Sequence, residues 1–304
     1  MLNILKQFYD LKVIGLIKIN EHVYKIKTED HYYIMKSFVM SNKQDISLFE
    51  NLESFHIDCF VCILKNKFND ILSYYDGLYY YVMKYIELDY YTFREFKIKN
   101  YFEILSYLHL KTLCHKKVNK KYFKNLYLEL NEIINSRIMY YESLVKNYET
   151  IQYKSPFQWF YVLNYYKIFN ALNLSIHYLN EYIKMCETCT SVRICLNYGN
   201  FDYHHICIKD KLLISIDHIR YDMPLYDLYN IYQKIPDFMF DLDCFKSDYF
   251  NKIEFLEEEY VLLYCLMNIV PIAVFDHDEL DNIIKFSRLL YYLDSINEFI
   301  NSSH

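Results

Sequence analysis

Glycine and proline are scarce in this chain of 304 residues, which has 3 glycines and 4 prolines. Both residues mark turns and irregular loops, so their scarcity argues against long structureless segments. Apolar residues make up 53% of the chain and charged residues 24%, which is a globular balance rather than a disordered one. A chain of this length can bury a sizeable core, as one large domain or as two lobes.

The sequence also lacks an apolar run long enough to span a bilayer. The longest run, Tyr260 to Phe275, contains Asn268 and Pro271 and falls short of the roughly 20 residues that a spanning helix needs. We therefore expect it to form a buried helix in a soluble protein. Lys6 and Asp10 interrupt the first apolar stretch, so no signal peptide is predicted and the expected location is cytoplasmic.

The 9 cysteines are an odd number without a regular spacing, and this predicts a reducing compartment rather than a disulfide framework. Two pairs, Cys59/Cys62 and Cys186/Cys189, have the CxxC spacing of a zinc site. The first pair, however, lies in an apolar, strand-like run, where alternation would point its two cysteines to opposite faces. The net charge of −6 argues against nucleic acid as the main partner.

The first eighty-odd residues show the alternation of β-strands around one helix. A turn is expected at Asp76-Gly77. The residues at helical spacing are Ile46, Phe49, Leu52, Glu53 and His56. The expected strands are Val23–Thr28, Tyr32–Lys36, Cys59–Leu64, Ile71–Tyr75 and Leu78–Tyr85. Residues 1–86 are thus predicted to form a small antiparallel sheet with one inserted helix.

Beyond about residue 90 the apolar period becomes helical. One long amphipathic helix is expected around Phe123–Tyr148, a second over Pro156–Met185, and a last one around Leu280–Ile296. The pattern predicts an α+β protein with a β-rich N-lobe over 1–86 and a larger, mainly helical C-lobe over 87–304. The two lobes would join near Met83–Glu87.

One strand resembles a known functional element. Tyr32-Tyr-Ile-Met-Lys-Ser37 resembles the strand that carries the phosphate-contacting lysine of kinase-like folds, with Lys36 at the lysine position. In that superfamily the lysine pairs with a glutamate on the following helix, and both Glu50 and Glu53 match this role.

The segment Tyr80-Tyr-Val-Met-Lys-Tyr-Ile86 resembles the hinge between the two lobes of those folds. The resemblance implies that the backbone near Met83, Lys84 and Ile86 faces an adenine. The glycine-rich phosphate loop is missing, because the turn in Ile17–Tyr24 contains no glycine.

The segment 196–208 resembles the catalytic loop of aminoglycoside phosphotransferases, which reads His-Gly-Asp, a few residues, then Asn and a short strand. Tyr203-His204 matches a further detail, since CotS-type spore-coat proteins of this superfamily usually have His, often after Tyr, before that Asn. Gly199 sets the register. The resemblance then puts Asn200 at the catalytic aspartate and His205 at the metal-binding asparagine.

A shifted register is the weaker alternative for this loop. Asp202 would then be the catalytic base, but Cys207 would fall on the metal position and the glycine would lose its match.

The segment 213–228 resembles the magnesium-binding strand end of the same family and the helix start after it. Asp217 matches the metal-binding aspartate. Asp222 and Asp227 match the following segment, whose second aspartate usually braces the catalytic loop.

Together these segments resemble the aminoglycoside phosphotransferase and choline-kinase-like superfamily, with the CotS-type spore-coat proteins as the best match. The resemblance implies a two-lobed protein-kinase-like fold and ATP with Mg or Mn as cofactors. Asn200 is neutral and cannot accept a proton, and losing a general base typically costs about 10²–10⁴-fold in rate. His205 offers imidazole where magnesium prefers oxygen.

The expected protein is therefore a pseudokinase, acting as a binding or structural component among other spore-coat proteins. Two alternatives stay open. One is an active ATP-dependent kinase that phosphorylates a hydroxyl group of a small molecule, with His205 binding manganese or Asp202 as base. The other is a regulatory nucleotide-binding module unrelated to spores.

Overall fold

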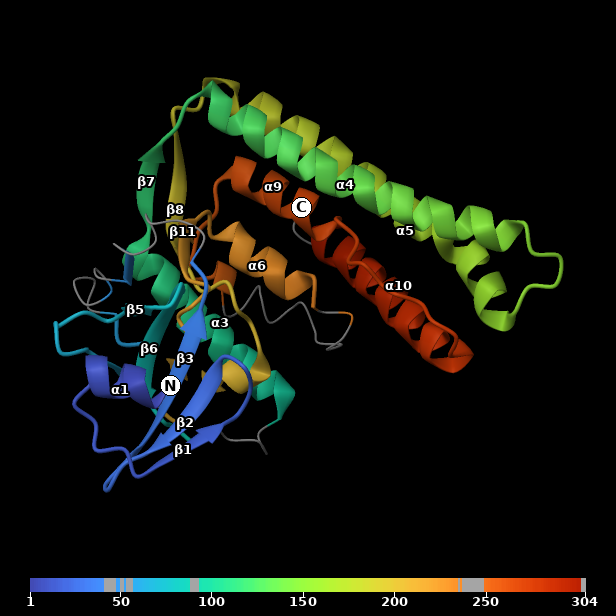
Figure 1. The fold of residues 1–304 in the computed structure, drawn as a ribbon. Helices are drawn as coiled ribbons and strands as arrows, with labels where there is room; N and C mark the ends of the chain where they lie inside the picture. The colour runs from blue at the N-terminus through green and yellow to red at the C-terminus, as the bar shows by residue number, and fades with distance from the viewer. Residues whose placement is uncertain are drawn as a thin grey trace. The chain divides into compact units, whose positions relative to one another are not determined.

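The computed structural model describes residues 1–40, 48–49, 52, 57–87, 93–234, 236 and 249–301. Contacts divide the chain into two compact units (Figure 1). Unit 1 comprises Met1–Thr112 and Tyr198–Tyr221, and unit 2 comprises Leu113–Asn197 and Asp222–His304. The segments expected to carry the catalytic loop and the metal ligand thus fall mostly in the unit of the N-terminal sheet. The lobe boundary near residue 86 stays a prediction.

Unit 1 is built on an antiparallel sheet with the strand order β1-β2-β3-β6-β4, in which β5 also pairs with β6. Buried residues of the first helix and of the sheet form one apolar cluster: Ile4, Leu5, Tyr9, Ile26, Met35, Tyr80 and Val82. The elements that precede the catalytic loop are α1 (Leu2–Phe8), β1 (Gly15–Lys18), β2 (Val23–Lys27), β3 (Tyr32–Phe38), β4 (Ile63–Leu64), β5 (Ser73–Tyr75), β6 (Leu78–Lys84) and α3 (Arg94–Thr112).

Most of the expected strands are confirmed. Strands β2, β3, β5 and β6 lie within two residues of the predicted bounds. The turn between β5 and β6 is also confirmed, because Asp76 and Gly77 both have positive φ, 50° and 81°, as a tight hairpin turn of primed type requires.

The strand expected over Cys59–Leu64 is wrong in its first half. Only Ile63–Leu64 joins the sheet, as β4, while Phe60 forms a parallel bridge with Leu213. The amide of Val61 donates to Leu213 O at 3.0 Å, and the amide of Leu213 donates to Cys59 O at 2.7 Å. The backbone of this segment therefore pairs with the hairpin of β9 (Ile206–Cys207) and β10 (Leu212–Leu213), which follows the catalytic loop.

Unit 2 is mainly helical. Helix α5 packs against α4, α9 and α10, and strands β7 and β8 form an antiparallel pair. The bounds are β7 (Cys114–Lys117), α4 (Lys120–Glu149), α5 (Pro156–Met185), η1 (Cys186–Thr188), β8 (Ser191–Asn197), α6 (Leu225–Tyr232), α9 (Glu257–Met267) and α10 (Glu279–Asn301). The three predicted long helices are confirmed as α4, α5 and α10.

Helix α5 begins where the sequence indicates. Ser155 accepts from the amide of Gln158, and the Gln158 side chain accepts from the amide of Ser155, which is a capping box. Pro156 follows at the first helical position, where a missing N–H group costs nothing.

The helix expected over Tyr260–Phe275 is too long by eight residues, because α9 ends at Met267. Pro271 lacks an N–H group and disfavours helical backbone at the residue before it, so the helix cannot continue through it. The expected burial is confirmed for the residues from Leu262 to Val270.

The observed architecture is α+β, with an antiparallel sheet in the N-terminal part and helices in the C-terminal part, as predicted. In the described part of the chain, no helix combines the length and the apolar character that a membrane span requires. The helix expected between Ile46 and His56 falls largely outside the described residues, and so do Glu50 and Glu53.

Candidate functional site

The side chains of Lys36 and Asp217 form an ion pair inside unit 1. Lys36 is on β3, and its Nζ lies 2.8 Å from Asp217 Oδ1. The same ammonium donates to Ser215 Oγ at 3.1 Å. Only 15% of the lysine side chain and 6% of the aspartate side chain are exposed. Two residues that sequence resemblance assigned to nucleotide and metal binding are thus in direct contact.

Tyr81 is a third member of this cluster. It lies opposite Lys36 in the register of β3 and β6 and is fully buried. Its hydroxyl donates to Asp217 Oδ1 at 3.0 Å and accepts from the amide of Ile216 at 3.3 Å. Burial, together with the charge of Asp217, raises the pKa of Tyr81 well above its usual value, so the hydroxyl stays protonated and keeps donating.

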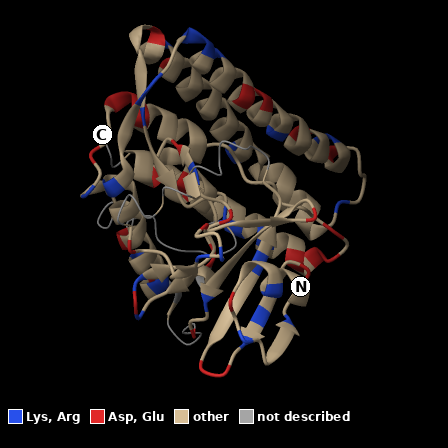
Figure 2. Cartoon of the chain, turned by 60° about the vertical axis from the view of Figure 1, so that its left-hand side comes forward, with Lys and Arg blue, Asp and Glu red and all other residues tan. Residues whose placement is uncertain are grey.

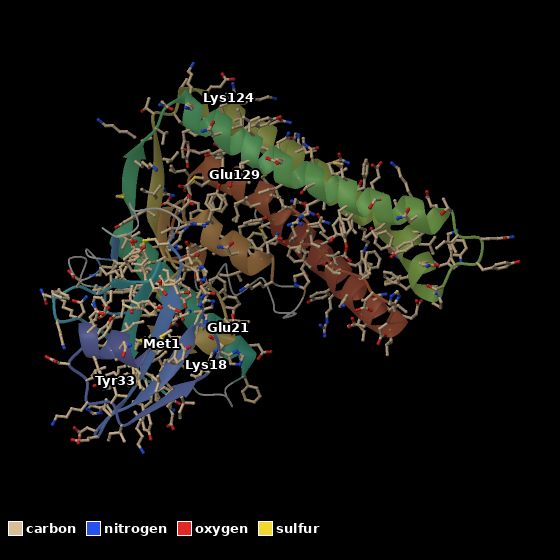
Figure 3. All side chains as sticks on the ribbon, in the orientation of Figure 1. Met1, Lys18, Glu21, Tyr33, Lys124 and Glu129 are labelled. Atoms are coloured by element: carbon tan, nitrogen blue, oxygen red, sulfur yellow. The ribbon has the colours of Figure 1, made fainter. Side chains whose placement is uncertain are left out.

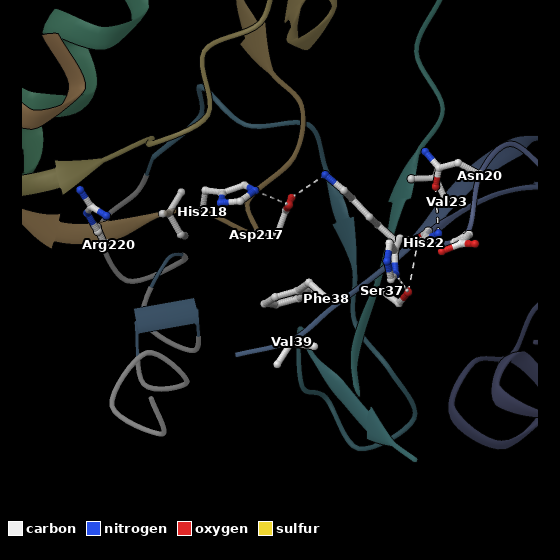
Figure 4. A pocket seen from close by; sticks show the side chains of 12 residues that line it. Asn20, His22, Val23, Ser37, Phe38, Val39, Asp217, His218 and Arg220 are labelled. Carbon is white, nitrogen blue, oxygen red and sulfur yellow. Dashed lines mark hydrogen bonds and ion pairs between the residues drawn. The ribbon is translucent and has the colours of Figure 1, made fainter. Parts of the chain in front are cut away.

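Asp217 is held in its ionised form. Burial alone would raise the pKa of this carboxyl, but the charge and the hydrogen bond of Lys36 outweigh burial and lower it. The second oxygen, Oδ2, lies 3.2 Å from His218 Nε2. Figure 4 shows Asp217 between the imidazole of His218 and the lysine ammonium, with both contacts as dashed lines.

The backbone around this aspartate is tightly constrained. Ser215 has a φ of 71°, a left-handed conformation that is uncommon for a residue with a side chain. Gly199 in the catalytic loop has a φ of 72°, and a Cβ atom built on it would lie 2.5 Å from His218 O. Glycine at position 199 therefore lets the catalytic loop approach the backbone that follows Asp217.

A pocket of about 800 Å³ opens beside the ion pair, within unit 1 (Figure 4). Its walls come from the turn between β1 and β2, from β3 and from the segment after Asp217. The lining residues are Asn20, Glu21, His22, Val23, Lys36, Ser37, Phe38, Val39, Asp217, His218, Ile219 and Arg220. The volume falls in the range of small-molecule sites.

The segment 196–208, expected to be the catalytic loop, brings Asn200 and His205 into contact. His205 Nδ1 lies 3.2 Å from the backbone oxygen of Asn200. A carbonyl oxygen only accepts, so Nδ1 carries the hydrogen and Nε2 of the neutral ring keeps its lone pair. Burial lowers the pKa of His205, with a smaller contribution from the charge of Lys36. The ring is therefore neutral near pH 7.

The side chain of Asp202, the alternative base, takes part in hydrogen bonds with a residue near it in the loop. It caps η2 (Tyr203–His205), accepting from the amide of His204 at 2.8 Å, and it contacts His204 Nδ1 at 2.9 Å. Burial would raise the pKa of Asp202, but these two contacts lower it overall. A carboxylate with a depressed pKa is a weak proton acceptor.

Of the three residues expected at the hinge, two lie in a strand of the sheet and one lies beyond its end. Met83 and Lys84 belong to β6, where Lys84 pairs with Tyr33 on one side and its amide donates to Cys62 O on the other. Ile86 lies two residues beyond the end of the strand and is half-buried. The backbone of Lys84 is thus occupied inside the sheet.

The two aspartates expected as a brace lie in unit 2. Asp222 Oδ1 accepts from the amide of Met223 at 2.9 Å. Asp227 is buried in the first turn of α6. Burial, with a contribution from the charge of Asp227, raises the pKa of the Cys195 thiol. Their role as a brace stays a prediction, and the glutamate partner of Lys36, at Glu50 or Glu53, lies outside the described residues.

The described site fits an anionic phosphate group. An ammonium has three N–H donors, and among the described residues Lys36 uses two of them, on Ser215 and Asp217. Arg220 adds a second cation to the pocket wall, and Glu21 and Asp217 add two carboxylates, so the formal charges of these four lining side chains balance.

The same residues fit a divalent metal ion poorly. Magnesium needs near-octahedral oxygen ligands, whereas Asp217 Oδ1 already accepts from Lys36 and Tyr81, and His205 offers nitrogen. Across the described ranges, no group of three or more His, Cys, Asp or Glu side chains is arranged to hold a metal.

Known structures share this fold. An aminoglycoside phosphotransferase from Alicyclobacillus acidocaldarius superposes with a TM-score of 0.72 at 11% identity, over 97% of this chain and 94% of the other. The AMP-bound spectinomycin phosphotransferase, APH(9)-Ia, superposes with a TM-score of 0.50 at 13% identity, over 98% and 88%. No protein-family model matches the sequence, and no curated protein matches it significantly. The chain therefore has the aminoglycoside phosphotransferase, protein-kinase-like fold.

Gly199→Ala should destabilise the protein more than Gly77→Ala does. Both glycines have positive φ, which costs an alanine about 1–2 kcal/mol. Only at position 199 would the new Cβ also meet a backbone oxygen, and overpacking adds about 1–3 kcal/mol. Urea unfolding measures both free energies, and equal losses for the two variants would contradict the close approach of the loop to His218.

Proposed function

We propose that this chain is a degenerate phosphotransferase that binds the phosphates of a nucleotide beside Lys36 and transfers phosphate poorly or not at all. The observation that carries the proposal is the contrast between two parts of one site. The pair of Lys36 and Asp217, the residues that the resemblance assigns to phosphate and metal, is in direct contact and largely buried. The loop beside it has the neutral Asn200 where the resemblance expects a carboxylate.

The binding half of the proposal rests on charge and shape. The pocket of about 800 Å³ is lined by Lys36 and Arg220 among other residues, and cations of this kind are the usual partners of phosphate oxygens. The spectinomycin phosphotransferase that shares the fold binds AMP, which supports a nucleotide as the occupant. When bound, ATP would supply the phosphoryl group and its negative charge.

The catalytic half rests on proton transfer. A hydroxyl that attacks a phosphoryl group needs a positioned acceptor for its proton. Asn200 has an amide, which can orient a hydroxyl by hydrogen bonding but cannot take its proton. Asp202 is engaged by His204. Neither residue therefore offers a general base matched to neutral pH.

We also propose the finer assignment, a spore-coat component of CotS type with other coat proteins as partners. It is supported by the resemblance of Tyr203-His204 to that group, while the segment 213–228 resembles the wider phosphotransferase family. A protein that keeps a folded site but loses its base can still serve as a binding or structural part of an assembly.

Asn200→Asp tests the catalytic half. We expect no ATP turnover above background in the wild type and a rise of about 10²-fold or more in the variant, because the substitution restores the base. Hydrolysis of ATP by water is the measurement, since it needs no acceptor substrate. Asn200→Asp combined with His205→Asn should be faster still, because the second change restores an oxygen donor.

Asp202→Asn is the matched control, because it removes a nearby carboxylate that the proposal leaves without a catalytic role. Wild-type turnover that is abolished by Lys36→Met and by Asp202→Asn would instead establish an active kinase with Asp202 as its base.

The coat assignment is tested in a spore-forming host. We expect a tagged copy of the protein to appear in the spore and to leave it only with reagents that extract the coat. A copy found entirely in the mother-cell or vegetative cytoplasm would contradict the assignment, and the nucleotide proposal would be unaffected.

A further inference from the structure

Unit 2 contains a second pocket, with a volume of about 860 Å³. It lies between the start of α4 and the end of α5, and it continues along the η1 turn. The lining residues are Lys120, Phe123, Lys124, Tyr127, Asn180, Ile183, Lys184, Cys186, Glu187 and Thr188. None of them belongs to the site described in unit 1.

The floor of this pocket is apolar. Phe123 is 5% exposed and Cys186 is 4% exposed, while Tyr127 and Ile183 are half-buried beside them. Burial raises the pKa of the Cys186 thiol to about 12, so the thiol is neutral and acts as a small apolar group. The floor therefore suits the flat or aliphatic body of a ligand.

The rim of the pocket is basic. Lys120, Lys124 and Lys184 are exposed lining residues, and no carboxylate of a described residue lies within ion-pair distance of these three lysines. Lysine is also frequent just outside the rim, at Lys116, Lys117 and Lys121. Figure 2 shows this local concentration of blue on β7 and the first turns of α4, and Figure 3 labels Lys124 there.

The pocket has fewer acidic than basic side chains in its lining. Glu187 lines the pocket, Glu258 is close enough to raise the pKa of Cys186 slightly, and Glu129 lies further along α4. The pocket wall itself thus has an excess of two positive charges, three lysines against one glutamate, in a chain whose net charge is −6. Such a local reversal of sign concentrates anions at the site.

We propose that this pocket binds a small amphipathic anion, with an aromatic or acyl body on the Phe123 floor and a phosphate or carboxylate among the three rim lysines. The side chains of Asn180 and Thr188 offer neutral hydrogen-bonding groups between floor and rim. The site is separate from the proposed nucleotide site, since its residues come entirely from unit 2.

The volume and the charge of the chain favour a small molecule over a nucleic acid. The pocket has the size of a drug-like ligand site, and a basic patch confined to one pocket lacks the extended face that a nucleic-acid backbone requires.

Naphthyl phosphate is a suitable probe, with neutral naphthol and inorganic phosphate as comparisons. We expect titration calorimetry to give a Kd below about 1 mM for naphthyl phosphate. Naphthol and inorganic phosphate should each bind at least about tenfold more weakly. Naphthol lacks the phosphate that the rim lysines would bind, and inorganic phosphate lacks the aromatic body that the floor would contact. The affinity for naphthyl phosphate should fall as salt is added.

The triple variant Lys120→Gln, Lys124→Gln, Lys184→Gln should weaken binding by about tenfold or more. The matched control is Lys99→Gln, Lys146→Gln, Lys252→Gln, which removes the same charge from exposed positions outside the pocket and should bind like the wild type. Asn180→Trp should block the pocket without removing charge. Lys36→Met, used once circular dichroism shows that the variant is folded, separates this site from the one in unit 1 and should leave binding in this pocket unchanged.

Three results would overturn the proposal. The first is an absence of naphthyl phosphate binding to the folded wild type. The second is equal weakening by the two triple variants, which would indicate a general charge effect. The third is loss of binding in Lys36→Met with none in the pocket variants, which would assign the probe to the site in unit 1.

Discussion

The ion pair of Lys36 and Asp217 is the interaction on which the site of unit 1 depends. Both side chains are largely buried, and a buried charge that loses its partner destabilises a protein by about 3–5 kcal/mol. Ser215, Tyr81 and His218 satisfy the remaining atoms of the pair. The pair therefore fixes β3, β6 and the segment around Asp217 against one another, although these segments are far apart in the sequence.

This constraint is compatible with the proposed function, in which the site binds phosphate without a catalytic base. The pair contributes to folding and forms part of the pocket wall, so substitutions that break it are costly. Among the described residues, Asn200 contacts His205 through its backbone oxygen, which does not depend on the side chain at position 200. Under the proposed function, an amide in place of a carboxylate at this position removes a proton acceptor and keeps the backbone contact.

The sequence predicted the elements whose apolar period is regular. Helices α4, α5 and α10 show apolar residues at helical spacing, and β2, β3 and β6 are apolar runs bounded by polar turns, so the sequence indicates both kinds of element. Helix α3 was not predicted, because it is buried on several sides and its buried residues include the polar Lys97, Asn100, Ser106 and His109. The pairing of Phe60 with Leu213 depends on a distant hairpin, which no local pattern records.

The site residues that the sequence predicted are those to which the family resemblance assigns a role. Lys36 and Asp217 were identified in that way, and the structure brings them together. Tyr81 was missed because its position opposite Lys36 follows from strand register, although it lies inside the segment read as a hinge. His218 and Ser215 flank Asp217 closely in the sequence, but their contacts depend on a loop whose left-handed backbone at Ser215 the sequence does not signal.

The central claim is that Lys36 still anchors the phosphates of a nucleotide, with little help from a metal ion. The melting temperature should be measured with ATP in EDTA, in magnesium and in manganese, for the wild type and for Lys36→Met. A ligand at about 100 times its Kd stabilises a fold by about 2.7 kcal/mol, so the account predicts a clear rise for the wild type in all three conditions and none for the variant. The absence of a rise in the wild type, or an equal rise in Lys36→Met, would contradict it.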